Sequence, residues 1–290
     1  MDITTLNSSA VTVAQLEFLP RLLLRRREVA SRLTVDQRSP FPLRTCLRAS
    51  SGKPPVAGVR SVPDEAVVCS PAENLELKKK AMNISADLKW TSIFLVGMKS
   101  DVKEQIGKLL AELLRYYYFD SDGLVEEVAG GEASAKLYLE TDEKGFLESE
   151  TEVLKQLSSM GRLVVCAGDG AVQSSTNLAL LRHGISIWVD IPIDRVLDGL
   201  IKDRPGSQSP HSLSESEQNQ LLAQLAAIYE ETREGYATAD ATISLQKAAL
   251  NHGYNDMTEV TIEDMTMEVL KEIGKLIRAR KVMEEAGRPF

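Results

Sequence analysis

One segment has the spacing of a phosphate-binding loop but not all of its residues. Gly97 and Lys103 follow the apolar run 92–96, six positions apart. In a working loop, backbone N–H groups surround the phosphates, a lysine neutralises them and a Ser or Thr hydroxyl binds Mg²⁺. Here Val102 replaces the second glycine and Glu104 replaces the hydroxyl residue. Valine does not adopt the required backbone conformations freely, and a glutamate adds negative charge beside the phosphates. These residues therefore predict a degenerate phosphate loop.

Two further polar clusters follow apolar runs in the same way. They are Asp120-Ser121-Asp122, after the run 116–119, and Gly168-Asp169-Gly170, after the run 162–167. Ligands of parallel α/β sheets bind at the carboxyl ends of the strands, so both clusters are candidate site residues. By itself, the Asp-Ser-Asp pattern is equally typical of a helix N-cap.

Short apolar runs alternate with amphipathic segments through most of the chain. We expect strands at 92–97, 116–119, 162–167, 185–190 and 241–245, the last at a sheet edge. We expect helices at 102–114, 148–157, 176–182, 193–201, 215–231 and 264–285. This order predicts a three-layer α/β/α fold, in which a five-stranded parallel sheet has helices on both faces.

The order of the motifs resembles that of the shikimate kinases, small relatives of the nucleoside monophosphate kinases. The resemblance covers about residues 88–250 and adds two motifs, Asp203-Arg204-Pro205 and Tyr236-Ala237-Thr238-Ala239-Asp240. It implies a P-loop kinase fold, with ATP and Mg²⁺ as cosubstrates, shikimate as the acceptor and a flexible lid over the nucleotide.

Several residues match the family's functional positions. The resemblance implies that Asp120 lies on the metal side, and that Asp122 binds substrate hydroxyls and is a candidate base. It places Gly97, Lys103 and Arg204 at the nucleotide, and Gly168 and Gly170 in the turn that approaches the substrate.

Six other positions depart from the family pattern, namely Ser100, Val102, Glu104, Leu147, Asp169 and Thr232. Leu147 and Thr232 stand where the family has arginines for the substrate carboxylate, and Arg233 is about 100° around a helix from the second of these positions. Asp169 replaces a glycine of the substrate turn, where its charge would repel an anion. The loss of each arginine should weaken the binding of the substrate carboxylate by about 2–5 kcal/mol.

These losses predict a pseudoenzyme with no catalytic residue, no bound metal and no cofactor, Mg-ATP included. The chain resembles the plant shikimate-kinase-like branch, and this resemblance implies an inactive chloroplast protein with a role in chloroplast biogenesis. Two alternatives stay open. One is a kinase with an altered acceptor, which Asp169 would suit if the acceptor were cationic. The other is a regulator that binds nucleotide without turnover.

Charge divides the 290-residue chain into a basic leader and an acidic remainder. Residues 1–60 carry ten basic and four acidic residues, while the remaining 230 carry 24 basic and 38 acidic, a net charge of −14. An Arg-rich, Ser-rich and acid-poor start is typical of an organelle transit peptide. The alternative is a basic tail that binds an acidic partner. We therefore expect a transit peptide and basic leader at 1–60. Composition does not distinguish chloroplast from mitochondrion, and it is the resemblance that implies a mature protein in the chloroplast stroma.

The acidic remainder argues against nucleic-acid binding, and no apolar run approaches the 18 residues of a membrane span. We expect a protein partner of unknown identity.

After the leader, the sequence predicts three further segments. They are a linker and lead-in helix at 61–87, the kinase-like domain at 88–250 and a helical extension that packs on it at 251–290. Cys166, on a buried strand, is predicted to be a core residue.

Overall fold

Five parallel strands form one sheet in the order β2-β3-β1-β4-β5. They are β1 (Ile93–Val96), β2 (Tyr117–Asp120), β3 (Leu163–Cys166), β4 (Ile185–Asp190) and β5 (Ala241–Ser244). Every residue of β1 and β3 is buried, as expected for central strands of a sheet covered on both faces. All five predicted strands and the predicted fold class are confirmed, and β5 is an edge strand.

The computed structural model describes residues 71–202 and 215–287. The predicted leader at 1–60 and Arg204 lie outside these ranges. Among the described residues, no helix combines the length and the apolar character needed to cross a membrane.

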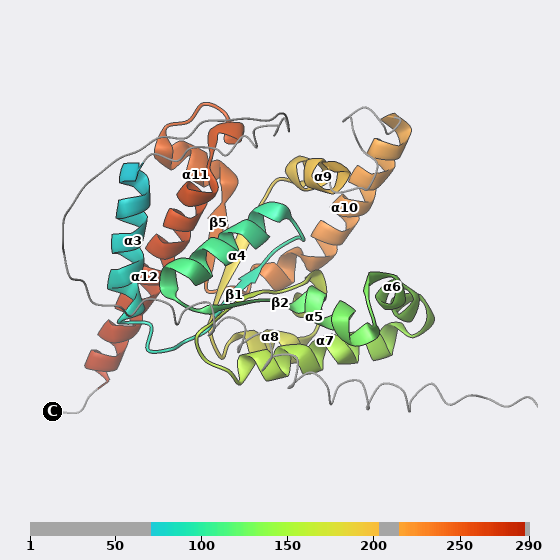
Figure 1. Ribbon diagram of the computed structural model, residues 1–290, viewed down its shortest axis with the longest axis horizontal. Helices are drawn as coiled ribbons and strands as arrows, with labels where there is room; N and C mark the ends of the chain where they lie inside the picture. The colour runs from blue at the N-terminus through green and yellow to red at the C-terminus, as the bar shows by residue number, and fades with distance from the viewer. Residues whose placement is uncertain (1–70, 203–214, 288–290) are drawn as a thin grey trace, which may run out of the picture.

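One group of helices covers one face of the sheet (Figure 1). It consists of α3 (Pro71–Ser85), α4 (Asp101–Leu114), α11 (Leu245–His252) and α12 (Ile262–Ala286), and α3, α4 and α12 pack against one another. Leu77, Ala81 and Ile84 of α3 face the core, as do Val269 and Ile273 of α12. Both ends of the described chain therefore contribute to the same hydrophobic core.

The chain between β2 and β5 supplies the other helices. They are α5 (Ser121–Ala129), α6 (Glu132–Thr141), α7 (Glu143–Ser158), α8 (Ser175–Leu181), α9 (Ile193–Lys202) and α10 (Glu215–Tyr236), with the short 3₁₀ turn η1 (Asp169–Val172). A second 3₁₀ turn, η2 (Met257–Glu259), lies between α11 and α12. The strand order reverses direction at β2, so right-handed crossovers place α7 and α8 on the sheet face opposite α4 (Figure 1). The sequence did not predict α5, α6 or α11. Helix α7 is six residues longer than predicted and α10 is five residues longer.

Gly107 allows α4 to lie close to the sheet. A Cβ at this position would be 2.7 Å from the Cys166 Sγ and 2.9 Å from the Tyr118 Cε2. We expect Gly107→Ala to lower the free energy of unfolding by about 1–3 kcal/mol, because an overpacked core must shift to admit a methyl group.

Gly274→Ala on α12 is the matched control for this prediction. The nearest atom to its Cβ would be the Arg278 Nη1 at 3.6 Å, so the added methyl group only improves helix propensity. Urea unfolding should show a loss for Gly107→Ala and a gain of up to about 1 kcal/mol for Gly274→Ala. Equal effects of the two variants would contradict this account of α4 packing.

Candidate functional site

The turn after β1 requires a glycine. Gly97 has a φ of +133°, and a Cβ there would be 2.5 Å from the Val189 carbonyl oxygen of β4. Ser100 then caps α4, since its side chain accepts a hydrogen bond from the Lys103 N–H at 3.3 Å. Asp101 and Glu104 lie in the first turn of α4, where acidic groups interact favourably with the helix dipole. The positive end of this helix therefore faces the chain's own carboxylates.

The Lys103 side chain is used inside the protein. It is only 4% exposed, and its Nζ donates to the carbonyl oxygens of Gly97 at 2.5 Å and Ala167 at 2.8 Å. The ammonium group thus joins the carboxyl ends of β1 and β3. The neighbouring Glu104 forms an exposed ion pair with Lys108, with 2.5 Å between Oε1 and Nζ.

A cavity of about 390 Å³ lies beside this loop. One wall combines the start of α4 with Asp120 and Asp122, and the opposite wall comes from α9 and the η2–α12 segment. Lys99 also lines the cavity. Within the described parts of the chain, no group of three or more His, Cys, Asp and Glu residues is placed to hold a metal ion.

Three carboxylates surround the turn that follows β3. The Asp122 carboxylate fills the space that a Cβ on Gly168 would need, and the Glu150 carboxylate does the same at Gly170. Between these glycines, the Asp169 Oδ1 accepts a hydrogen bond from the Tyr236 hydroxyl at 2.9 Å. Because Tyr236 is fully buried, Asp169 is fixed in the turn.

Burial raises the pKa values of two carboxyl groups in this cluster, those of Asp122 and Glu150. Burial raises the pKa of Asp122 to about 6, although Lys103 acts to lower it. The pKa of Glu150 rises to about 7 because of burial first, and then because of the charges of Asp122 and Asp169. The Glu150 Oε2 is buried without a hydrogen-bond partner. The cluster therefore opposes its own ionisation.

Lys99 lies at the edge of this acid cluster. Burial acts to lower its pKa, but Asp122, Glu126 and other nearby acids outweigh burial, and the net shift is upward. Its Nζ is 3.7 Å from the Glu126 Oε1. The region therefore attracts a cation and repels an anion.

The shikimate kinase family model matches residues 102–265. The chain belongs to the shikimate kinase family.

Its relatives include plant proteins of two kinds. It is 58% identical over 214 residues to a probable inactive shikimate kinase-like protein, chloroplastic, of Arabidopsis thaliana, covering 74% of this chain and 73% of that protein. It is 34% identical over 236 residues to the chloroplastic shikimate kinase 2 of Oryza sativa subsp. japonica, covering 80% and 72%. Both plant relatives are named chloroplastic, which supports the predicted location.

A solved structure of the family agrees with the fold. The shikimate kinase of Acinetobacter baumannii in complex with shikimate has a TM-score of 0.50 and 26% identity, covering 66% of this chain and 97% of that one.

Leu147 and Thr232, which the resemblance places at two arginine positions of the shikimate kinases, lie in different surroundings. Leu147 lies on α7 and lines a surface groove with Thr176 and Leu180. Thr232 is 2% exposed, and its Oγ1 donates to the Ile228 carbonyl at 2.7 Å. Arg233 is exposed, as the predicted 100° offset requires. The Arg233 side chain therefore does not share the buried position of Thr232.

The structure also clarifies residues that the sequence left open. Asp120 caps α5, because its side chain accepts from the Gly123 N–H at 3.3 Å, so the N-cap interpretation is confirmed for this residue. Cys166 is buried in β3, and burial raises the pKa of its thiol to about 11, as expected for a core residue. No role was predicted for Lys99 or Glu150. Its position in the sequence could have identified Glu150. The resemblance expects an arginine at 147, and such an arginine would lie next to residue 150, one helical turn further along α7.

Proposed function

We propose that this chain is a non-catalytic member of the shikimate kinase family, located in the chloroplast stroma, that supports chloroplast biogenesis by binding a protein partner. The observation that carries the proposal is the position of Asp169, held in the substrate turn by Tyr236 and flanked by Asp122 and Glu150. Its Arabidopsis relative, named probable inactive, supports the same view.

The substrate half of the site disfavours shikimate for an electrostatic reason. Shikimate carries a carboxylate, and here the turn that would receive it presents the Asp169 and Glu150 carboxylates. A threonine and a leucine occupy the two arginine positions. Two missing arginines cost about 2–5 kcal/mol each, so affinity falls by several orders of magnitude even before repulsion is counted.

The nucleotide half disfavours Mg-ATP as well. To reach a phosphate, the Lys103 ammonium would have to leave two backbone carbonyls that are buried with it. Those carbonyls would then need new donors, and an unsatisfied buried group costs about 1–3 kcal/mol. Phosphoryl transfer depends on positioning and charge neutralisation, and both are compromised in this loop. No cofactor and no metal is therefore part of the proposal.

Wild-type protein should release no ADP in response to shikimate and should show no thermal shift with Mg-ATP. The chloroplastic shikimate kinase 2 of rice, assayed in parallel, serves as the positive control. Turnover comparable with that enzyme would disprove the pseudoenzyme proposal. A saturable thermal shift without turnover would favour the nucleotide-binding regulator, for which the cavity beside Lys103 has room.

A kinase with a different acceptor is the second candidate, and the acid cluster is the observation that favours it. Asp122, Glu150 and Asp169 would attract a cationic acceptor, and Asp122 has a pKa of about 6, which suits a base. ADP release in the presence of amine-bearing acceptors, lost in Asp122→Asn, would establish it.

A further inference from the structure

Every non-glycine residue with a positive φ in the described chain lies at the amino ends of the strands. Lys89 and Trp90 precede β1, with φ of +46° and +72°, and Arg115 and Arg162 precede β2 and β3, with φ of +58° and +63°. Because β3 lies between β1 and β2, these four residues share one end of three adjacent strands. We call them the Trp90 patch. A positive φ is common at a helix C-cap such as Arg115, but elsewhere it is costly for a bulky residue and is found most often at functional sites.

Lys89 and Trp90 form the middle of a tight turn that other residues would form more easily. The Thr91 N–H donates to the Leu88 carbonyl at 2.9 Å, and both residues between them have a positive φ. This is the pattern of a type I′ turn, for which Asn-Gly is strongly preferred. The turn instead presents a lysine and a tryptophan to solvent, and Trp90 is 68% exposed. The backbone therefore does not explain these residue types, which indicates a role for the side chains.

Hydrogen bonds join the Trp90 turn to the start of β3. The Arg162 N–H donates to the Trp90 carbonyl at 2.8 Å, and the Ser92 hydroxyl donates to the Met160 carbonyl at 2.8 Å. The Arg162 guanidinium lies over the Trp90 indole, with its carbon 4.7 Å from the ring centroid. A guanidinium stacked on an aromatic ring keeps N–H groups available for a carboxylate. The patch is therefore pre-organised, which lowers the entropic cost of binding.

The cations of the patch have no acidic partner in the described part of the chain. A groove of about 400 Å³ lies beside Lys89, between the start of β4 and α12. The acids that line this groove are engaged within the chain, in the pairs Asp87 with Lys281, Glu284 with Arg280 and Asp240 with Ser186. Lys89, Arg115 and Arg162 are exposed and form no ion pair with a described residue. Residues 61–290 contain 38 acidic and only 24 basic residues, so three unpaired cations at one place are unexpected.

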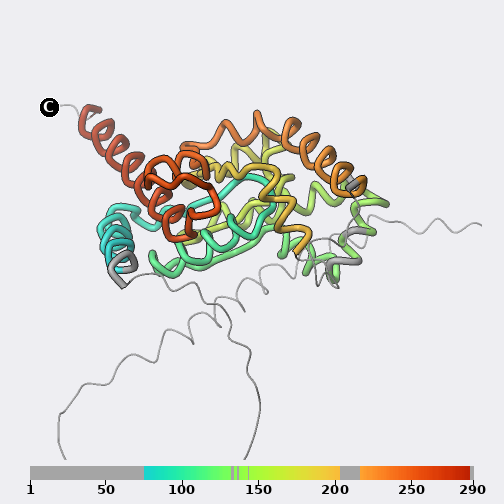
Figure 2. Tube along the Cα trace, turned by 90° about the horizontal axis from the view of Figure 1, so that it is seen from above, coloured from blue at the N-terminus to red at the C-terminus, as the bar shows by residue number. Residues whose placement is uncertain are grey.

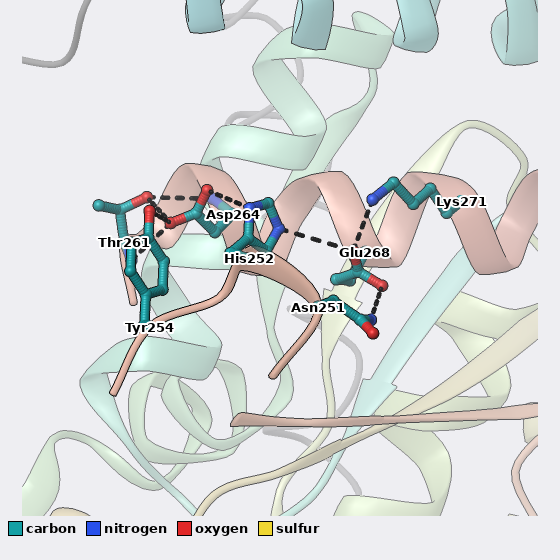
Figure 3. Close-up of polar contacts among 7 residues, drawn as sticks. All are labelled: Asn251, His252, Tyr254, Thr261, Asp264, Glu268 and Lys271. Carbon is teal, nitrogen blue, oxygen red and sulfur yellow. Dashed lines mark hydrogen bonds and ion pairs between the residues drawn. The ribbon is translucent and has the colours of Figure 1, made fainter. Parts of the chain in front are cut away.

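Helix α12 borders the groove and is held in place from its other end. It lies beside α3, the helix that precedes the Trp90 turn (Figure 2). His252 of α11 lies between two carboxylates of α12, with its Nδ1 3.4 Å from the Asp264 Oδ1 and its Nε2 3.7 Å from the Glu268 Oε1 (Figure 3). Tyr254 also donates to the Asp264 Oδ2 at 3.1 Å. These contacts do not involve the patch, so substitutions in the patch should leave α12 in place.

We infer that the Trp90 patch binds an acidic segment of a protein partner, in which carboxylates flank an apolar side chain. The apolar side chain packs on the exposed part of the Trp90 indole. Carboxylates on one side of it pair with Arg115 and Arg162, and those on the other side pair with Lys89. Tryptophan and arginine are the residue types that most often dominate the binding energy of protein interfaces. This inference rests on the proposed function, in which the chain acts by binding a protein.

Charge favours a protein segment over a membrane or a nucleic acid. Polybasic membrane sites contain about 4–8 lysines and arginines, and proteins that bind nucleic acids neutralise about 6–10 phosphates. The patch has three cations, and residues 61–290 carry a net charge of −14. An extended anionic surface would repel the rest of such a chain, whereas a short acidic segment contacts the patch alone.

The probe for this site is a capped nonapeptide with one leucine between two runs of four glutamates. Labelled with fluorescein and titrated with the full chain, it should show saturable anisotropy that added salt weakens. Arg162→Glu should raise the Kd at least about 30-fold, because it places a carboxylate opposite those of the peptide. Lys247→Glu is the matched control, since Lys247 is exposed on α11, which follows the carboxyl end of β5. This control should change the Kd less than about twofold.

Trp90 reports its own contact with the peptide. Unlabelled peptide should protect Trp90 from quenching by acrylamide. The chain has two tryptophans, so Trp90→Phe retains only the fluorescence of Trp188, which is stacked on Tyr236. Quenching of this variant should not change when the peptide is added.

An exchange of the turn separates binding from stability. Lys89→Asn combined with Trp90→Gly supplies the residues that a type I′ turn prefers, so the double variant should unfold at a higher temperature than the parent chain. It should nevertheless lose the peptide, because a cation and the aromatic ring are gone. Full binding by this stable variant would overturn the inference.

Three other results would also overturn it. They are the absence of saturable binding up to millimolar peptide, equal losses of affinity in Arg162→Glu and Lys247→Glu, and binding of phosphatidylglycerol vesicles or single-stranded RNA at the patch in place of the peptide. ADP release with shikimate, measured on the same protein, tests the proposed function separately. Turnover together with peptide binding at the patch would disprove the pseudoenzyme alone, and a chain with neither turnover nor peptide binding would disprove only this inference.

Discussion

A chain with six replacements toward the family pattern should bind shikimate at least about a thousandfold more tightly than the parent chain and should release ADP in its presence. The replacements are Ser100→Gly, Val102→Gly, Glu104→Ser, Leu147→Arg, Asp169→Gly and Thr232→Arg. Three of them act on each half of the site, so the two halves can be tested separately.

The replacements in the substrate half suit the surroundings of each residue. An arginine at 147 lies three residues before Glu150 on α7, so it supplies the partner that the buried Glu150 Oε2 lacks. Position 232 shares a buried helix face with Tyr236, which contacts the substrate turn through Asp169. Asp169→Gly removes the carboxylate that repels the substrate. Together these changes exchange an anionic pocket for a cationic one.

The replacements in the nucleotide half carry little structural cost. Glu104→Ser removes an exposed ion pair with Lys108, which contributes at most about 1 kcal/mol. Ser100→Gly removes an N-cap, and glycine in that position costs only a few tenths of a kcal/mol. With Val102→Gly, the loop regains backbone freedom to surround a phosphate, which can then compete with two carbonyls for the Lys103 ammonium.

Binding measured by calorimetry should separate the two triple variants. The substrate triple should gain shikimate binding alone, and the loop triple should gain Mg-ATP binding alone. The six-residue variant with Asp122→Asn added is the control, expected to bind both ligands without turnover. A folded six-residue variant that binds neither ligand would show that other residues closed the site.

The strands were predictable because burial on both faces requires apolar runs such as Ile93–Val96, and these stand out from their surroundings. Helices α5 and α6 were not predicted, because they are only nine and ten residues long. Asp120 starts α5, and Gly130, with a φ of +94°, ends it. Neither helix has the long amphipathic repeat that identifies α4.

The altered phosphate loop was also visible in the sequence, since its pattern depends on spacing within nine residues. The hydrogen bonds of the Lys103 ammonium group could not be predicted, because the Ala167 carbonyl to which it donates is 64 residues away in the sequence. The bond between Tyr236 and Asp169 likewise joins positions 67 residues apart. Contacts of this kind follow from the sheet order, in which β1 lies next to β3.

Glu150→Gln should stabilise the protein in alkaline solution. The pKa of Glu150 is raised from 4.5 to about 7, so the native state holds a proton that the unfolded chain has released in this interval. Stability should therefore fall as the pH rises from about 4.5 through about 7, because the folded protein must then bury an unpaired carboxylate. Above about pH 8 the variant should exceed the parent by about 2–3 kcal/mol in free energy of unfolding.

Urea unfolding at a series of pH values measures this effect. The difference between Glu150→Gln and the parent should shrink toward zero near pH 4.5, where both side chains are neutral. Glu148→Gln is the control on the same helix, since the Glu148 side chain is 68% exposed and pairs only loosely with Lys144 at 3.9 Å. Its effect should stay within about 0.5 kcal/mol at every pH. Equal stability of Glu150→Gln and the parent in alkaline solution would mean that Glu150 is solvated. A solvated Glu150 would be ionised at neutral pH, so it would still repel an anionic substrate together with Asp122 and Asp169, but water would screen its charge.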